Sequence, residues 1–420
     1  MNRYDSFKDS GVEWIGEIPS GWDIGKLKHL CEENLRSLSN STDPNYELNY
    51  IEISDVNSEG VIGVSTPYIF SESPSRCRRI VQKGDVIVST VRTYLKSIGH
   101  IENEVQDLIC STGFSVLTPK GKFISKYLFY LLRTDWFISK VISKSEGVSY
   151  PSIQSEKLMN IDVLYCGISE QQQMVTFLDT KTSLIDSLIS KTQQKIDLLK
   201  EKRLKLVEDV ILNSNTKRVR LGYVVDLVKR PIDRENNETY TKIGMYNWGR
   251  GIFKYPSELG SDLGDSTFNY IKEGDLLLSG QFSWEGSVSL VEQEQDNCIS
   301  SHRFHILNGI EGKILNEYLW SYFTSQEGHF LLNENSPGSA GRNRPLNIGK
   351  LLKEKIPVPE MEIQMEIQRL VIETNNYEKY SKRRTELLKE YRQSLISEVV
   401  TGKIRVCEED NSLSLNPHTV

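Results

Sequence analysis

Two stretches of the chain place apolar residues at the spacing of paired helices. In the first, steps of four and three residues connect Ile185, Ile189, Thr192, Ile196, Leu199, Arg203, Leu206 and Val210. In the second, the same steps connect Ile363, Ile367, Leu370, Thr374, Tyr377, Ser381, Arg384, Leu388 and Tyr391, and continue to Leu395 and Val399. A repeat of about 3.5 residues is typical of a left-handed coiled coil, in which polar interruptions can fix the register. We therefore predict two long helices that pair along these residues.

Neither stretch contains Pro or Gly, over 169–213 and over 360–401. At roughly 1.5 Å per residue, each helix would reach about 60 Å. Their charges balance, with seven basic and seven acidic residues in 170–213 and eight of each in 360–403. A surface that holds phosphates would be basic, so these helices are predicted to be spacers and interfaces.

Short β-rich runs bounded by Gly, Ser and Pro precede each helix, among them GDVIVSTV at 84–91 and GDLLLSG at 274–280. Helical patches interrupt them, as around 126–143. The pattern favours an α/β (mixed α+β) globular head before each helix.

The chain is a tandem duplication. LLKEKRLKLVEDVI begins at Leu198 and LLKEYRQSLISEVV at Leu387, an offset of 189. Four further pairs have offsets of 190 to 194: Asp85 and Asp275, Phe114 and Phe304, Tyr127 and Tyr318, Leu27 and Leu221. The helices match better than the heads do. We infer that the helices perform one task twice, whereas each head binds something different.

The expected division has six parts. They are an N-terminal arm (1–21), a first head (22–166), a first spacer helix (167–214), a second head (215–358), a second spacer helix (359–403) and a flexible tail (404–420).

Composition narrows the class of protein. The chain has 420 residues, 38% hydrophobic and 26% charged, which is typical of folded domains. It has no apolar run of the ~18 residues that a membrane span needs and no secretory signal. Six cysteines without a CxxC pair indicate reduced thiols in the cytoplasm. A net charge of −6 argues against indiscriminate nucleic-acid binding, but it leaves room for local basic patches.

No catalytic motif is present. GxxxxGK[ST], HExxH, GxSxG and GxGxxG are all missing. His302 and His305 form an HxxH in a strand-like run without other ligands, so we predict no metal site. Asp43-Pro44-Asn45-Tyr46 is better explained as a turn than as a methyltransferase loop. The chain is therefore predicted to be a binding protein without catalytic residues.

Several segments, in this order, resemble the specificity (S, HsdS-type) subunit of type I restriction–modification systems. They are the opening YDSFKDSGVEWIGEIPSGW, the GD[VL] strand of each half, SYPSIQSEKLMNIDVLY leading into ISEQQQMVTFLD, and LLKEYRQSLISEVVTGKIRV. The second half departs from the pattern, since PVPEMEIQMEIQRLV keeps Glu362 and Gln364 but not the glutamine run.

The resemblance implies a non-catalytic DNA-binding subunit of the bacterial or archaeal cytoplasm. Each head would be a target-recognition domain that reads one half of a bipartite, asymmetric double-stranded DNA site. The two helices would form an antiparallel coiled coil that sets the unread spacer and docks two methyltransferase (M) subunits. S-adenosylmethionine would bind the M subunits, which methylate adenine, and the restriction (R) subunits would use ATP and Mg²⁺. This chain would carry no cofactor.

Candidate DNA contacts are residues that can reach base edges or phosphates. In the first head they are Arg76, Arg78, Arg79, Arg92, Tyr94, Lys96, Ser149 and Tyr150. In the second head they are Gln281, Ser283, Trp284, His302, Arg303, Arg342, Asn343 and Arg344.

Two other classes remain open. A coiled-coil scaffold with two protein- or sugar-binding heads would expose a large apolar patch on the heads in place of clustered arginines. A stand-alone methyltransferase or nuclease would bind S-adenosylmethionine or cleave DNA by itself.

Overall fold

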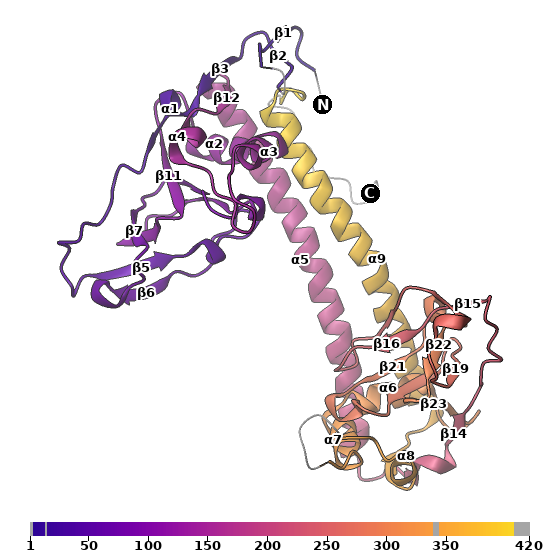
Figure 1. The fold of residues 1–420 in the computed structure, drawn as a ribbon. Coiled ribbons are helices and arrows are strands. Elements are labelled where there is room, and N and C mark those ends of the chain that lie inside the picture. Colours follow the sequence, from indigo (N-terminus) through magenta and orange to yellow (C-terminus); the bar gives the residue numbers. More distant parts are fainter. Residues whose placement is uncertain (1–2, 13–14, 339–343, 407–420) are drawn as a thin grey trace. The chain divides into compact units, whose positions relative to one another are not determined.

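The computed structural model describes residues 3–12, 15–338 and 344–406, which form two compact units (Figure 1). The first unit contains residues up to Ile189 and those from Arg384 onward, and the second contains Ser190–Arg383. Each unit therefore holds one head, the first half of the helix that follows this head, and the second half of the other long helix.

The first head is built on two four-stranded sheets, ordered β4–β11–β8–β9 and β6–β5–β10–β7, and on the pair β3–β12. The pair β5 and β10 is parallel, and the other pairs are antiparallel. The strands are β3 (Asp23–Lys26), β4 (Cys31–Glu33), β5 (Glu47–Ile51), β6 (Thr66–Ile69), β7 (Cys77–Ile80), β8 (Val86–Ser89), β9 (Ile98–His100), β10 (Leu108–Ser111), β11 (Phe114–Pro119) and β12 (Asp162–Tyr165).

The second head repeats this frame. Its four-stranded sheet β14–β23–β20–β21 has the order of β4–β11–β8–β9, and β13–β24 corresponds to β3–β12. Its other pairs are β15–β18, β16–β17 and β19–β22. The strands are β13 (Arg218–Arg220), β14 (Val225–Val228), β15 (Thr239–Tyr240), β16 (Ile243–Met245), β17 (Ile252–Lys254), β18 (Glu258–Leu259), β19 (Phe268–Tyr270), β20 (Leu276–Ser279), β21 (Val288–Leu290), β22 (Ile299–Ser301), β23 (Phe304–Gly309) and β24 (Lys355–Pro357).

The helices repeat as well. The short helices are α1 (Leu27–Leu30), α2 (Ser125–Leu132), α3 (Asp135–Ser143), α4 (Ser155–Met159), α6 (Asn316–Phe323), α7 (Gln326–Glu334) and α8 (Ile348–Leu351). The long helices are α5 (Ile168–Leu212) and α9 (Met361–Val400). Gly402, which has a φ of +74°, follows the end of α9 in a left-handed conformation that stops a helix. The prediction of two mixed α/β heads, each followed by a long helix, is confirmed.

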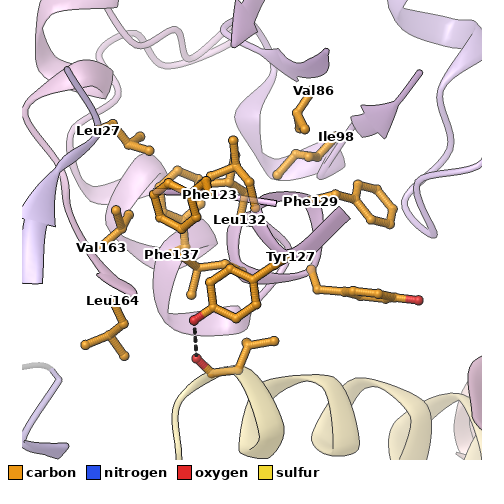
Figure 2. Packing of buried hydrophobic residues seen from close by; sticks show 14 of the residues in the cluster. Leu27, Val86, Ile98, Phe123, Tyr127, Phe129, Leu132, Phe137, Val163 and Leu164 are labelled. Carbon is orange, nitrogen blue, oxygen red and sulfur yellow. Dashed lines mark hydrogen bonds between the residues drawn. The ribbon is translucent and has the colours of Figure 1, made fainter. Parts of the chain in front are cut away.

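Both long helices contribute to the core of each unit. In the first unit, Met174, Phe177 and Leu178 of α5 and Leu395 and Val399 of α9 belong to one buried cluster with the aromatic residues of α2. Figure 2 shows Tyr127 of α2 pointing at α9, where its hydroxyl donates to the Val400 carbonyl at 3.4 Å. In the second unit, Val207 and Val210 of α5 and Ile367 and Val371 of α9 pack with α6.

Within each unit the two helices run antiparallel. In the first unit, Asp186 lies 3.3 Å from Arg392, while residues 174–178 share the core with 395–400. In the second, Lys200 pairs with Glu378 at 2.5 Å and Lys202 with Glu366 at 3.6 Å. Residue numbers thus rise along α5 as they fall along α9.

The structure buries most of the predicted seam. Ile185, Ile196, Val210, Ile367, Leu370, Leu388, Leu395 and Val399 are buried, and Ile189, Leu199, Leu206 and Tyr377 are half-buried. Ile363, Arg384 and Tyr391 were predicted wrongly, because their side chains are exposed. Gln364 is the buried residue of the turn that holds Ile363. Val207, Val371, Ile396 and Val400 are also buried. These parts of the helices face the head as well as the other helix, so the buried face is wider than an a/d stripe.

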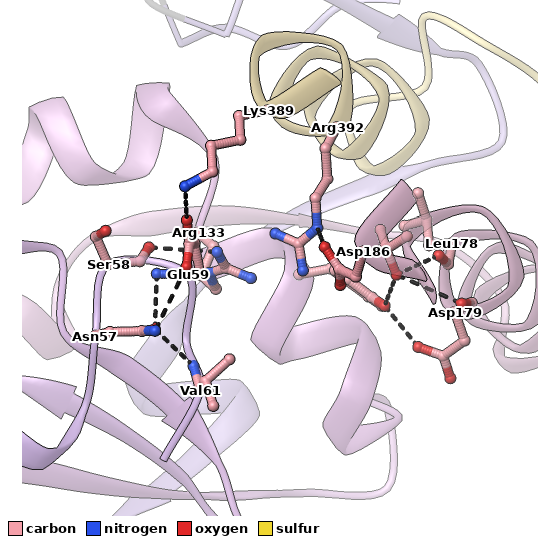
Figure 3. A network of polar contacts seen from close by, with 12 residues as sticks. Asn57, Ser58, Glu59, Val61, Arg133, Leu178, Asp179, Asp186, Lys389 and Arg392 are labelled. Atoms are coloured by element: carbon pink, nitrogen blue, oxygen red, sulfur yellow. Dashed lines mark hydrogen bonds and ion pairs between the residues drawn. The ribbon is translucent and has the colours of Figure 1, made fainter. Parts of the chain in front are cut away.

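Polar contacts also join the first head to both helices (Figure 3). The Lys389 ammonium donates to Glu59 at 2.9 Å and holds the pKa of that carboxyl below its usual value. Arg133 donates to the Ser58 carbonyl at 3.3 Å, and its own carbonyl accepts from Gln393 at 2.9 Å. Burial lowers the pKa of Arg133 to about 10, so this arginine is still charged at neutral pH.

One buried glutamine at the start of each long helix is bonded identically in the two units. Gln171 accepts from the Ile124 amide at 2.8 Å and donates to the carbonyls of Lys122 and Cys166, both at 2.8 Å. Gln364 accepts from the Leu315 amide at 2.8 Å and donates to Lys313 at 3.2 Å and Pro359 at 2.9 Å. Each amide therefore ties its helix to the loop before α2 or α6.

The N-terminal hairpin, β1 (Phe7–Asp9) with β2 (Glu17–Pro19), precedes the first head. Tyr4 donates to Glu170 at 2.6 Å, and Trp22 donates to the same carboxylate at 3.2 Å. Val406 is buried and Ile404 packs beside it, so the start of the expected tail at 404 is wrong, and the rest of that tail, from 407, lies outside the described residues.

No helix among the described residues is long and apolar enough to cross a lipid bilayer. Cys31, Cys77, Cys110, Cys166 and Cys298 are buried free thiols.

We predict that Gln171→Ala and Gln364→Ala each lower the free energy of unfolding by about 1–3 kcal/mol, because each leaves buried amide and carbonyl groups without partners. Thermal or urea unfolding measures the loss. The exposed neighbour Gln172→Ala is the matched control and should change stability by less than about 0.5 kcal/mol. Equal effects at 171 and 172 would contradict the assigned role.

Candidate nucleic-acid interface

The Gly-Asp pair of each half positions the strand that leads to the candidate residues. Asp85 is buried, accepts from the Gln82 amide at 2.8 Å and pairs with Arg36 at 2.6 Å. Asp275 repeats both contacts, with the Lys272 amide at 2.8 Å and Arg230 at 2.6 Å. The motif is therefore structural: it fixes where β8 and β20 begin and hence where the loops after them lie.

In the first head, backbone hydrogen bonds hold the loop after β8 against two other segments. The Thr90 amide donates to Gly113 at 2.8 Å, the Thr90 carbonyl accepts from Ile153 at 2.8 Å, and the Arg92 amide donates to Pro151 at 2.7 Å. Arg92 and Lys96 have φ of +49° and +57°, a conformation that non-glycine residues rarely adopt. The loop is thus held in one shape by its neighbours.

A stacked arginine joins the first head's candidate residues. The Arg92 guanidinium lies 4.9 Å from the centre of the Tyr150 ring, and both side chains are exposed. Ser149 is exposed beside them, on a loop closed by two hydrogen bonds between Glu146 and Ser152, at 2.8 and 2.9 Å. The structure therefore brings Arg92, Ser149 and Tyr150 together on one surface.

The remaining candidate residues of the first head differ in how accessible their side chains are to a ligand. Tyr94 is 50% exposed in the 3-10 turn Thr93–Leu95, and Lys96 lies 3.5 Å from Asp135. The Arg76 side chain is exposed, and its carbonyl accepts from Thr112, next to Gly113 of the loop contact. Arg78 stacks on Phe70 at 4.8 Å, and Arg79 is half-buried in β7.

The second head repeats the backbone frame with other side chains. Gly280 donates to Arg303 at 2.6 Å and accepts from Leu346 at 2.8 Å, as Thr90 does with Gly113 and Ile153. The Arg344 guanidinium lies 5.1 Å from the Trp284 ring centre and donates to the Ser336 carbonyl at 3.1 Å. In the first head the arginine comes from the loop after the strand, whereas in the second it comes from the segment before the short helix α8.

One candidate of the second head is wrong. Ser283 is fully buried and donates to the Ser279 carbonyl, so its hydroxyl is not available to a ligand. Gln281 is half-buried, and its backbone carbonyl accepts from the Trp284 indole at 3.2 Å. His302 and Arg303 are exposed. Arg342 and Asn343 lie outside the described residues.

A cavity of about 630 Å³ opens beside Gln281 and Arg303. It is also lined by Lys242, which precedes β16, by Asn247 of the loop between β16 and β17, and by Phe253 of β17. The sequence did not single out these residues, because their loop shares no sequence motif with the first half. The tryptophan in Asn247-Trp248-Gly249-Arg250 was the one visible signal.

The histidines near this surface do not form a metal site. Burial lowers the pKa of His305, and His302 is exposed. Within the described ranges, no group of three or more His, Cys, Asp or Glu residues is placed to hold a metal ion.

The family model of type I restriction modification DNA specificity domains matches residues 19–198 and again 213–379. The chain belongs to this family. The two matches correspond to the two repeats of the frame.

Curated relatives are of the same kind. The putative MjaX specificity subunit of Methanocaldococcus jannaschii is 23% identical over 93% of this chain and 96% of its own length. The MjaIX specificity subunit of the same organism is 26% identical, and this match spans 46% of the chain and 45% of the relative.

Solved structures share the fold. A chain of a type I restriction–modification system superposes with a TM-score of 0.62 at 19% identity, over 92% of this chain and 99% of that one. The HsdS subunit of Thermoanaerobacter tengcongensis gives a TM-score of 0.52 at 19% identity, over 92% and 98%.

We predict that Ser283→Ala and Trp284→Ala separate structure from recognition. Ser283→Ala should cost about 1 kcal/mol of stability through its lost hydrogen bond and leave the DNA sequence preference unchanged. Trp284→Ala removes the ring on which the Arg344 guanidinium stacks and should weaken DNA binding by about tenfold at fixed salt. Thermal unfolding and DNA titration of the assembled restriction–modification complex measure both effects. A changed preference in Ser283→Ala would contradict the assignment.

Proposed function

We propose that this chain is the DNA sequence-specificity subunit of a type I restriction–modification complex. Each head reads one half of a bipartite, asymmetric target in double-stranded DNA. The observation that carries the proposal is the twofold repeat of one backbone frame, with different side chains at the same place on each head. A protein that bound the same ligand twice would keep those side chains alike.

The contrasting loops supply the recognition chemistry. Arginine donates in a planar fork that suits guanine edges and phosphates, and tyrosine, serine and glutamine can bond base edges. Stacking on Tyr150 or Trp284 orients the guanidinium of Arg92 or Arg344 before DNA arrives. Because less side-chain freedom is then lost on binding, these arginines contribute more affinity than mobile ones would.

The long helices serve as a ruler and as a docking surface. Their balanced charge and their share in both cores suit a rigid spacer better than a DNA contact. In the second unit, exposed Met365, Ile372 and Tyr380 recur on α9 at steps of seven and eight residues, the spacing of one helix face. In the first, exposed Leu387 and Tyr391 lie four residues apart. We assign these apolar side chains to the docking of two methyltransferase subunits.

Catalysis belongs to the partner subunits in this proposal. The methyltransferase subunits bind S-adenosylmethionine, and the restriction subunits, which join through them, use ATP and Mg²⁺. The complex would act on DNA in the cytoplasm of a bacterial or archaeal cell.

Sequencing of modified bases in cells that express this chain with its methyltransferase subunit tests the proposal. We expect methyl-adenine in a split motif, with two short specific blocks around a fixed gap. Replacing residues 22–160 by those of a relative should change one block only. A soluble complex with an active methyltransferase subunit and no split motif would refute the function.

The ruler is tested by adding one heptad after Ser190 and one after Arg383, where α5 and α9 pass from one unit to the other. A heptad adds about 10 Å, so the gap in the methylated motif should widen by about three base pairs, with both blocks unchanged. A heptad in one helix alone is the control and should abolish assembly, because the pairing loses its register. A new block sequence after the double insertion would contradict the ruler.

A further inference from the structure

The loop between β16 and β17 presents a tryptophan to solvent in a strained conformation. Trp248 has a φ of +61°, which a bulky side chain rarely adopts, and the side chain is 67% exposed. Such strain persists only where surrounding contacts impose it, and it concentrates at functional sites.

Contacts with η6 (Ser283–Glu285) and the residue after it impose this conformation. The Trp248 amide donates to the Glu285 carbonyl at 3.1 Å, and the Gly249 amide donates to the Gly286 carbonyl at 2.9 Å. The Asn247 side chain donates to the Glu285 carboxylate. A Cβ at Gly249 would lie 2.6 Å from the Thr324 side chain, so the loop is also packed against the end of α6. The backbone of the loop is therefore fixed.

A neighbouring aromatic ring lies against the indole. The indole stacks on His329 of α7, with ring centres 4.9 Å apart and planes inclined by 29°. His329 covers one face of the indole, and two thirds of the side chain remain exposed. An exposed indole adds little to the core, so the stability of the fold does not explain why a tryptophan occupies this position.

The corresponding hairpin of the first head lacks this feature. There Val56 pairs with Ile62, and the loop carries Asn57, Ser58, Glu59 and Gly60. Arg133 donates to the Ser58 carbonyl, and Lys389 of α9 donates to Glu59. The tryptophan is thus a property of the second head and not of the shared frame.

The surroundings of Trp248 favour DNA as its ligand. The loop is hydrogen-bonded to the segment that follows β20, which carries Gln281 and Trp284. Arg250 lies on the same loop, with its guanidinium 5.6 Å from the centre of the exposed Tyr246 ring. The adjoining cavity is lined by Lys242, Gln281 and Arg303. Flat aromatic rings among cationic and amide donors provide base stacking together with phosphate contacts.

We propose that Trp248 stacks on the face of a base in the second half-site, at a base step that opens when the second head binds. This assignment rests on the proposed function. The rigid loop presents the indole already oriented, so stacking costs little conformational freedom. An inserted apolar ring that unstacks a base step adds specificity for steps that open easily.

Three variants of the complex with its methyltransferase subunit test the assignment on a duplex that carries the methylated motif. Trp248→Gly removes the ring and suits the positive φ, so its melting temperature should equal or exceed that of the unaltered protein. Its affinity for the duplex should fall roughly tenfold, the order of a lost base–aromatic contact. Trp248→Phe should retain most of the affinity. Tyr223→Ala, which removes another exposed aromatic ring of the same unit, is the control and should bind normally.

Duplexes with 2-aminopurine at successive positions of the second block locate the step. We expect the fluorescence to increase at one position when the complex binds, separate from any signal at the methylated adenine. Trp248→Gly should abolish this increase, and Trp248→Phe should keep it. The salt dependence of binding should keep its slope, because a stacking contact releases no counterion.

Three results would overturn the assignment. The first is an unaltered affinity of Trp248→Gly for the duplex. The second is a lower melting temperature of that variant, which would indicate a structural role. The third is a loss of the methyltransferase subunit from that variant in the absence of DNA, which would indicate a protein contact. Failure of the proposed function differs from all three, since the unaltered complex would then leave no split methylation motif.

Discussion

Each head completes its core with residues from both long helices, and the rest of the structure depends on this arrangement. Residues 174–178 and 395–400 close the first core, and Val207, Val210, Ile367 and Val371 close the second. Removing the end of either helix would expose part of a core. The buried amides of Gln171 and Gln364 then fix where each helix leaves its head. A helix held in this way cannot slide against its head without breaking three hydrogen bonds to buried groups.

Because the framework is held in this way, the loops that it carries can differ in side chains between the two heads. The backbone bonds of Thr90 and Gly280 match, as do the ion pairs of Asp85 and Asp275, although their neighbours differ. The two stacked arginines illustrate this difference. Arg92 comes from the loop after β8, whereas Arg344 comes from the segment before α8. The frame therefore specifies that a cation lies on an aromatic ring at this place, but not which segment supplies it. The side chains of these loops can therefore differ while the framework hydrogen bonds stay the same.

Much of the fold could be predicted because it follows from periodicity and repetition. The spacing of the seam residues predicted the long helices α5 and α9. The nearly constant offsets between the two halves of the sequence predicted two equivalent heads. The error at Ile363 has a physical cause: a heptad pattern registers apolar residues only, while the buried position is taken by the Gln364 amide, which bonds the nearby Pro359 carbonyl and the distant Lys313 carbonyl and Leu315 amide. Strand pairs such as Ile24 with Leu164 could not be predicted either, because such pairing depends on tertiary packing.

The candidate site was predictable by residue type but not by orientation. Ser283 and Trp284 are adjacent in sequence, yet one hydroxyl turns into the core and one ring supports an arginine. Trp248 was not selected as a candidate, because its presence in the sequence does not tell whether the side chain is exposed and strained or buried. Contacts over long sequence separations decide these differences.

The acidic charge of the chain is compatible with DNA binding because of where the arginines are held. The acidic residues include Asp85 and Asp275, which are buried and paired, and the helical carboxylates that pair across α5 and α9. Charges paired in this way contribute little to the field outside the protein. Arg92 and Arg344 stack on rings instead, and an aromatic ring does not neutralise the guanidinium. Local charge at the recognition loops can thus be positive while the net charge of the chain is −6, so base contacts rather than bulk attraction would decide where the protein binds.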